Sequence, residues 1–251
     1  MRQLRQVGRL ASVQVGTPHR YETDVDGAEG HPWRTSFVRV PSDERRWLFT
    51  THLDGNAQAD IKNHGSRDQA VLLYAAAHYP LWRRELGRDE IGPGGFGENL
   101  TIAGQSEAEV CVGDTYAIGA ISAADEDEDE DEDGDKHEDV AHLAQMQVTG
   151  PRYPCWKIER RWQAPGLTAR VAETGRTGWY CRVLREGSVA PEAPLLLVAR
   201  PYPDLSVARV NQFAHHTDPA NAQATARAIL SCDLINDWWQ AMATRRLRGE
   251  D

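Results

Sequence analysis

Residues 143–157 read LAQMQVTGPRYPCWK, a strand-like run that leads directly into a proline-framed segment. Leu143–Val148 has the residue pattern of a β-strand. Pro151 and Pro154 restrict φ to about −65° and bias the residues before them toward extended backbone. The stretch therefore predicts a strand followed by a stiff segment, and that segment presents Cys155.

Cys155 is the candidate chemical centre of the segment. Arg152 and Lys157 flank it, and nearby positive charge favours the thiolate, which is the nucleophilic and metal-ligating form of cysteine. A soft thiolate beside two cations suits a transition metal whose cofactor carries an anion. The alternative is a buried cysteine that behaves as a small apolar residue. Residues 151–157 taken alone slightly favour this alternative.

Short strand-like runs fill most of the chain before residue 200. They are Val7–Val15, Trp33–Val40, Arg46–His52, Glu109–Ile118, Gly178–Leu184 and Leu195–Ala199, with turn residues between them. Many short strands at nearly even spacing predict a mainly β fold, a barrel or a sandwich. Asp68–Arg84 differs, because its apolar residues have helical spacing, and we expect peripheral helix there.

The chain loses strand character after residue 202. Three short helical patterns follow, at Leu205–Phe213, Asn221–Leu230 and Leu234–Leu247. We therefore expect a β domain over residues 1–202 and a small helical domain over residues 203–251. In the last helix, the adjacent Trp238 and Trp239 must face different directions, which predicts one core indole and one partly exposed indole.

The formal net charge of −10 is concentrated in one segment. Residues 125–139 hold 12 acidic residues and one lysine, a net −11, so the rest of the chain carries about +1. We expect residues 124–139 to be a disordered loop between two strands, since such a run repels itself and long loops cost little stability. A docking or solvation role is the alternative to a tolerated expansion. Replacing the loop with Asn-Gly should leave the melting temperature within a few degrees, by thermal unfolding.

The composition also bears on compartment and partners. The four cysteines form no CxxC pair, and residues 1–7 lack the apolar core of a signal peptide. No run of 18 apolar residues is present to span a membrane. We therefore expect a cytoplasmic protein with free thiols that engages neither membranes nor nucleic acid.

Three further segments have chemical potential. Asn63–Val71 is a turn that enters a helix, where free backbone N–H groups offer an anion site, although Asp68 could be a simple N-cap. Gly92–Gly97 is glycine-rich and leads to Glu98 and Asn99, an acceptor and an amide donor. Arg176 lies in a glycine-containing turn before a strand-like run.

These segments form an ordered set. It consists of His64-Gly65, Asp68–Val71, Phe96–Leu100, Val112–Asp114, Arg152–Lys157 and Arg176–Leu184. In this order they resemble the MOSC domain family, named for the C-terminal domain of molybdenum cofactor sulfurase, and within it the compact bacterial YiiM-like subgroup. The resemblance covers most of residues 7–200, and the helical tail is similar to that subgroup's three-helix extension.

The resemblance implies a MOSC-type β-barrel that binds a molybdenum–pterin cofactor (Moco), with Cys155 as the metal ligand. It further implies a molybdoenzyme that reduces N-hydroxylated compounds, such as hydroxylamines and N-hydroxylated bases, to amines, which would be a detoxification. Since the chain has no haem, flavin or iron–sulfur motif, electrons would come from a separate reductase. The alternatives are a sulfur carrier or cofactor-handling module with a Cys155 persulfide, and a non-catalytic protein in which this thiol is inert.

Site residues follow from the same resemblance. The catalytic candidates are Cys155, His64, Glu98 and Asn99. The cofactor-binding candidates are Thr35, Arg39, Gly65, Arg152, Lys157 and Arg176, with Arg152 as the best single candidate for the cofactor's phosphate. The chain departs from the family pattern in having Ser66 where a second glycine is usual, and Arg39 where a lysine is usual.

Overall fold

The structure, a computed structural model, describes residues 4–22, 31–59, 65–119, 142–215 and 219–250. Residues 124–139 of the acidic loop and His64 lie outside the described residues.

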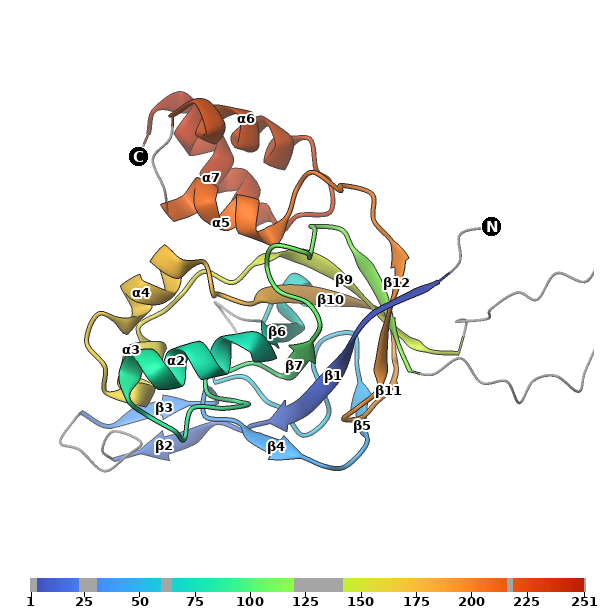
Figure 1. Ribbon diagram of the computed structural model, residues 1–251, viewed down its shortest axis with the longest axis vertical. Coiled ribbons are helices and arrows are strands. Elements are labelled where there is room, and N and C mark those ends of the chain that lie inside the picture. The colour runs from blue at the N-terminus through green and yellow to red at the C-terminus, as the bar shows by residue number, and fades with distance from the viewer. Residues whose placement is uncertain (1–3, 23–30, 60–64, 120–141, 216–218, 251) are drawn as a thin grey trace, which may run out of the picture.

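A closed β-barrel forms the body of the molecule (Figure 1). Among the described residues, seven strands close the ring in the order β12-β8-β9-β10-β6-β7-β1, and β1 pairs back with β12. Their bounds are β1 Arg5–Val15, β6 Val71–Ala75, β7 Leu100–Ala103, β8 Thr115–Ile118, β9 Ala144–Pro151, β10 Trp179–Arg185 and β12 Pro194–Ala199. The β6–β7 pair is parallel, and the other pairs in the ring are antiparallel. This confirms the mainly β prediction and decides for a barrel over a sandwich.

Short strands extend the barrel. β4 (Val40–Ser42) pairs with β1, and two small sheets join β2 (His19–Tyr21) to β3 (Trp33–Thr35) and β5 (Arg46–Leu48) to β11 (Gly187–Val189).

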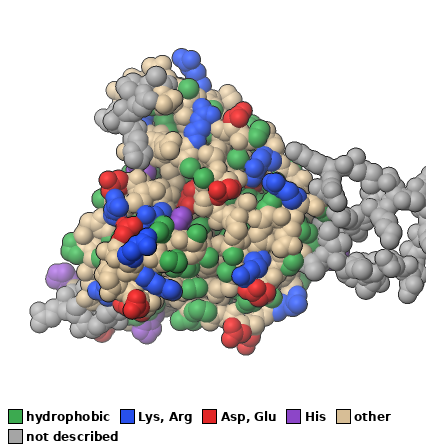
Figure 2. All heavy atoms as spheres, viewed as in Figure 1, with side chains coloured by type: hydrophobic (Ala, Val, Ile, Leu, Met, Phe, Trp, Pro, Cys, Tyr) green, Lys and Arg blue, Asp and Glu red, His purple; other side chains and the backbone are tan. Residues whose placement is uncertain are grey.

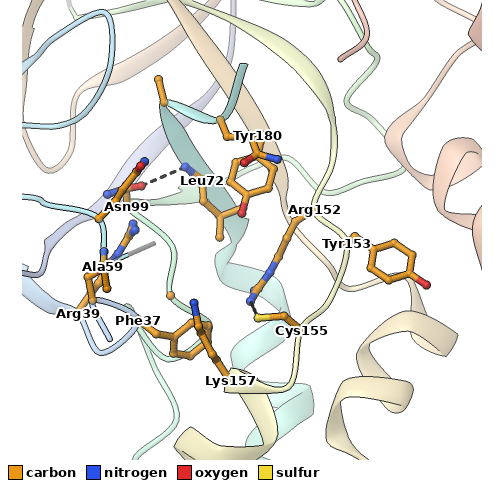
Figure 3. A pocket seen from close by; sticks show the side chains of 15 residues that line it. Phe37, Arg39, Ala59, Leu72, Asn99, Arg152, Tyr153, Cys155, Lys157 and Tyr180 are labelled. Atoms are coloured by element: carbon orange, nitrogen blue, oxygen red, sulfur yellow. Dashed lines mark hydrogen bonds between the residues drawn. The ribbon is translucent and has the colours of Figure 1, made fainter. Parts of the chain in front are cut away.

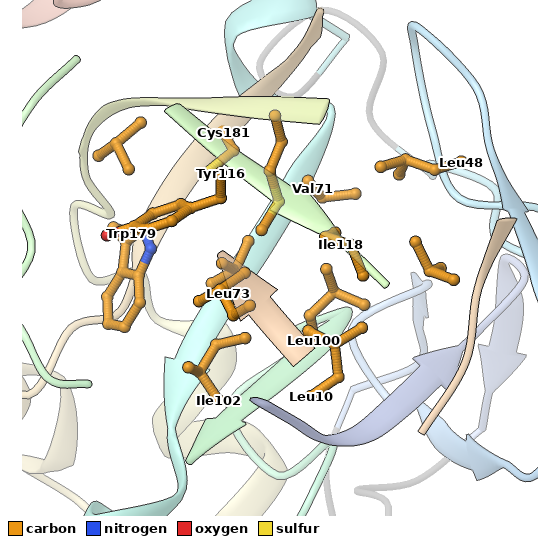
Figure 4. Packing of buried hydrophobic residues seen from close by; sticks show 14 of the residues in the cluster. Leu10, Leu48, Val71, Leu73, Leu100, Ile102, Tyr116, Ile118, Trp179 and Cys181 are labelled. Carbon is orange, nitrogen blue, oxygen red and sulfur yellow. The ribbon is translucent and has the colours of Figure 1, made fainter. Parts of the chain in front are cut away.

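The barrel interior is filled by apolar side chains from every strand of the ring (Figure 4). Strand alternation decides which residues face it: on β10, Trp179 and Cys181 are fully buried in this cluster, so Tyr180 between them faces outward. A fully buried Leu or Val such as Leu73 or Val71 contributes about 1.5–3 kcal/mol of transfer free energy.

The prediction of a helix over Asp68–Arg84 is wrong for the middle of this segment. Val71–Ala75 is β6, a central barrel strand in which every residue is buried. A continuous apolar run of this length fits a strand covered on both faces as well as a helix, and the pairings to β7 and β10 decide between them. Helix appears only at its ends, as η1 (Arg67–Gln69), η2 (Ala76–His78) and α2 (Tyr79–Leu86).

Helices α2, α3 (Lys157–Trp162) and α4 (Leu167–Thr174) lie to one side of the barrel (Figure 1). They enclose a second core rich in aromatic residues, in which the rings of Tyr74 and Phe96 stack at 4.8 Å. On the face shown in Figure 2, basic and acidic side chains are interspersed with hydrophobic ones.

Helices α5 (Val207–His215), α6 (Pro219–Leu230) and α7 (Asp237–Arg248) stack against one end of the barrel around their own apolar cluster (Figure 1). Trp239 is fully buried in this cluster, whereas Trp238 is 42% exposed, which confirms the prediction for the tryptophan pair. No helix within the described ranges has the length and apolar content needed to cross a membrane.

A buried ion pair lies between the barrel and this helical part. Asp114 is fully buried and accepts two hydrogen bonds from Arg200, at 2.8 Å from Nε and 2.7 Å from Nη2. Its carboxylate also accepts from the Cys111 N–H at 2.9 Å and the Tyr116 hydroxyl at 3.0 Å. The pair connects the entry of β8 to the chain that leaves β12 for the helices.

Candidate functional site

An open pocket of about 650 Å³, including space open to solvent, lies outside the barrel wall (Figure 3). It is lined by residues from six segments of the chain: Ser36, Phe37 and Arg39; Gln58 and Ala59; Gln69, Ala70 and Leu72; Gly97 and Asn99; Arg152, Tyr153, Cys155 and Lys157; and Tyr180. Cys155 and four other predicted site residues (Arg39, Asn99, Arg152 and Lys157) therefore meet in one place.

Cys155 follows the end of β9 and is held at its backbone. Its carbonyl accepts hydrogen bonds from the Ile158 N–H at 3.1 Å and the Thr168 hydroxyl at 3.1 Å, which anchors it to the start of α3 and to α4. The thiol is half-buried, whereas Cys111, Cys181 and Cys232 are buried. Cys155 is thus the cysteine with access to the pocket.

Arg152 is a fixed cation beside that thiol. The side chain is only 3% exposed, its Nη1 donates to the Phe96 carbonyl at 2.7 Å, and its Nη2 lies 3.8 Å from the Cys155 sulfur. The Arg152 backbone N–H also donates to the Gly178 carbonyl at 3.1 Å. One nitrogen of this guanidinium is thus already paired with a carbonyl, and the other terminal nitrogen faces the Cys155 sulfur.

Arg39 is a half-buried cation, and two of its guanidinium nitrogens lack a partner. Its Nε and Nη1 are shielded from solvent and have no hydrogen-bond acceptor. Burial lowers the pKa of Arg39 to about 10. Since a buried unpaired charge is costly, Arg39 is the residue of the pocket most in need of an anionic ligand.

Two amides of the pocket also keep unpaired atoms. Asn99 Oδ1 accepts from the Leu72 N–H at 3.1 Å, which fixes the orientation of the amide, and its Nδ2 has no partner. Gln69 Oε1 has no partner either. The pocket therefore offers one unmatched donor and one unmatched acceptor besides Arg39.

Glu98 serves the glycine-rich loop and is not among the residues that line the pocket. Its buried carboxylate accepts from the Tyr79 hydroxyl at 2.5 Å, from the Phe96 N–H at 3.0 Å and from the Gly94 N–H. Burial raises the pKa of Glu98, against the hydrogen bonds that lower it. Glu98 therefore stabilises the glycine-rich loop through these hydrogen bonds.

The glycines of this loop bring it close to the Arg39 segment. Gly94 and Gly97 have φ of +87° and +75°. A Cβ at Gly94 would lie 2.5 Å from the Arg39 carbonyl oxygen, and one at Gly97 would lie 2.7 Å from the Phe37 ring. Side chains here would therefore push the segment that carries Arg39 out of place.

Besides Glu98, three predicted site residues lie outside the lining. The Thr35 hydroxyl is buried and accepts from the Phe37 N–H at 3.0 Å, so it shapes the turn before Arg39. Gly65 is exposed. Arg176 is paired with Glu85 at 2.6 Å. His64 falls outside the described residues, so the structure tests no role for it.

Sequence reasoning missed Tyr180 as a lining residue. Burial raises the pKa of this phenol, and the nearby Arg152 opposes that effect. The available signal was the alternation along β10, which places Tyr180 opposite to the core-facing Trp179 and Cys181. Ser36, Phe37, Gln58 and Gln69 were also missed as site residues, because only the fold brings their segments to the pocket.

Comparisons with known proteins agree with this architecture. The model of the MOSC domain matches residues 60–195. The chain belongs to the MOSC domain family. The uncharacterised protein YflK of Bacillus subtilis is 35% identical over 92% of this chain and 91% of its own length. The crystal structure of YiiM from Geobacillus stearothermophilus is 28% identical, with a TM-score of 0.70 over 96% of this chain and 99% of that one.

A third relative is a longer protein named "Reductase" from Gibberella moniliformis. It is 34% identical over 89% of this chain, but the match covers only 36% of that protein. The region similar to this chain is thus only part of that longer protein.

Proposed function

We propose that this MOSC protein is a molybdenum–pterin-dependent oxidoreductase that reduces N-hydroxylated compounds to amines. The observation that carries the proposal is the pairing, in one pocket, of the half-buried Cys155 thiol with the Arg39 guanidinium, of which Nε and Nη1 are buried without an acceptor. A thiolate suits a soft metal, and an unpaired guanidinium suits a phosphate. The relative named "Reductase" supports redox chemistry.

The unmatched atoms of the pocket fit such a cofactor. Cys155 Sγ would hold the metal and Arg39 the phosphate. Asn99 Nδ2 and Gln69 Oε1 would pair with the donor and acceptor groups of the pterin ring. The Arg39, Asn99 and Gln69 atoms are buried without a partner, and such atoms are rare in native structures, where buried polar groups are nearly always hydrogen-bonded.

The cofactor, when bound, would supply the two-electron chemistry that removes the oxygen of an N–OH group. Conversion of a hydroxylamine to an amine and water takes two electrons and two protons, and the electrons would come from a separate reductase. Arg152, whose Nη2 lies 3.8 Å from the Cys155 sulfur, would hold the side chain of Cys155 in place. The Lys157 ammonium and the Tyr180 hydroxyl lie on the pocket wall as groups that can hold and donate protons.

The direct test is the composition and activity of the protein made in a host that synthesises the cofactor. We expect molybdenum and pterin in near-equal amounts to the chain, and reduction of an N-hydroxylated base in the presence of a reductase. Cyanide-releasable sulfur without molybdenum would overturn the proposal in favour of the persulfide carrier.

Arg39→Ala should lower cofactor affinity by about ten- to a hundredfold, because a charge-assisted contact to phosphate contributes about 1.5–3 kcal/mol. Molybdenum content after dialysis measures this. Arg161→Ala is the matched control, since Arg161 packs over the Trp162 ring at 4.4 Å and does not line the pocket. We therefore propose Arg39 as the phosphate contact in preference to Arg152, which is already paired. Equal molybdenum content in Arg39→Ala and the parent would show that this assignment is wrong.

A further inference from the structure

The C-terminal helices hold the end of the strand that leads to Cys155. The Asn236 backbone N–H and its Nδ2 both donate to the Thr149 carbonyl, at 3.0 and 3.2 Å. The Trp239 indole N–H donates to the Pro151 carbonyl at 3.1 Å. These contacts bind α7 and the residue that caps it to the last residues of β9, directly before the Cys155 segment.

Gly150 allows this close approach. Its φ is +137°, and a Cβ at this position would lie 2.9 Å from Cδ1 of Trp239. The Trp239 indole therefore rests on bare backbone. The contacts of Asn236 and Trp239 are buried and hold the end of β9, but they reach no further along the chain than Pro151.

Beyond Pro151, a group of half-exposed aromatic rings contacts the segment that leads to Cys155. The Tyr153 ring lies 4.9 Å from the Trp238 ring and 5.2 Å from the His215 ring, centroid to centroid. Figure 3 shows the Tyr153 ring turned away from Phe37 and Arg39, so this residue lines the pocket while its ring points out of it. Tyr153 is 49% exposed and Trp238 is 42% exposed, so hydrophobic burial alone explains their pairing poorly.

We propose that Trp238 and His215 are positioning residues that hold, through Tyr153, the segment presenting the Cys155 thiol. Tyr153 precedes Cys155 by two residues, and Pro154 between them leaves few backbone torsions to absorb a movement. A displacement of the Tyr153 ring is thus transmitted to the thiol. The helical tail is then part of the site without touching a ligand. The consequence for cofactor retention rests on the proposed function, whereas the effect on the thiol does not.

The test is the alkylation rate of Cys155 in cofactor-free, full-length protein. Cys111, Cys181 and Cys232 are buried, and Cys155→Ser gives their background rate. Trp238→Ala should raise the rate with iodoacetamide by about two- to tenfold, the ratio that corresponds to one aromatic pair. Trp238→Phe should keep the rate near the parent value, because a phenyl ring can still pack against Tyr153.

Two matched controls separate this effect from general loosening. Trp47 on β5 is 45% exposed and Leu247 on α7 is 38% exposed, and neither contacts the Cys155 segment through a ring pair. Trp47→Ala and Leu247→Ala should leave the alkylation rate at the parent value. If Trp238→Ala also left the rate unchanged, or if a control raised it equally, the positioning role would be wrong.

Tyr153 provides an independent arm. Tyr153→Ala should raise the rate, and the double variant with Trp238→Ala should exceed it little, since residues that act as one unit are not additive. Full additivity would contradict the proposal. In cofactor-loaded protein, Trp238→Ala should lose molybdenum faster on dialysis. If the unmutated protein contained no molybdenum, the proposed function would be wrong, whereas the alkylation result would still test the positioning role.

Discussion

Cys155→Ser should lower the reduction of N-hydroxylated substrates by more than about a hundredfold, since even residues that only support a metal ligand contribute 10–100-fold. The thiol is half-buried and its segment is held by backbone contacts, so we expect the melting temperature to stay within about 2 °C of the parent. Steady-state kinetics with a reductase and thermal unfolding on the same preparation measure both quantities.

Cys111→Ser is the matched control. The Cys111 thiol is buried and donates to the Pro203 carbonyl at 3.3 Å, a hydrogen bond that a serine hydroxyl can also make. This variant should keep parental activity. Full activity in Cys155→Ser would instead remove the thiol from the mechanism.

Asp114→Ala should lower the free energy of unfolding by about 3–5 kcal/mol, the usual cost of removing one partner of a buried ion pair. The carboxylate is fully buried, and its loss removes the charged partner of Arg200 and one hydrogen-bond acceptor each from the Cys111 N–H and the Tyr116 hydroxyl. For a chain of this length, the melting temperature should fall by roughly 10 °C. Chemical denaturation and calorimetry give the two values.

The contrast is an exposed ion pair on α4. Arg170 and Glu173 are 2.9 Å apart, and Glu173 is 65% exposed. Glu173→Ala should cost no more than about 1 kcal/mol. A similar small loss in Asp114→Ala would mean that solvent reaches this site and that the link between β8 and the helical part contributes little.

The elements that the sequence predicted well have strong local determinants. Proline restricts the backbone torsions wherever it occurs, so the prolines around Cys155 predicted a stiff segment. In the structure, this segment is held by hydrogen bonds and Cys155 lines the pocket. Trp238 and Trp239 face different directions because adjacent helical residues must. The ordered motifs likewise indicated the MOSC barrel, which the comparisons confirm.

Val71–Ala75 shows where local pattern is insufficient. Its continuous apolar run is compatible with a buried helix and with a buried strand, and the choice depends on partners that lie far away in the chain. The parallel pairing with β7 and the antiparallel pairing with β10 satisfy its backbone groups in the barrel. No property of residues 71–75 alone encodes those neighbours.

The roles of the polar residues were decided only by the tertiary structure, because they depend on which polar atoms are buried and which of these have a partner. Glu98 and Arg39 were both candidates by residue type, but Glu98 accepts from Tyr79 and from its own loop, whereas Arg39 Nε and Nη1 are buried without an acceptor. The sequence by itself determined which residues carry usable chemistry and how rigidly Cys155 is presented. Which of those groups are already paired, and which remain for a ligand, depends on contacts between distant segments that only the closed barrel brings together.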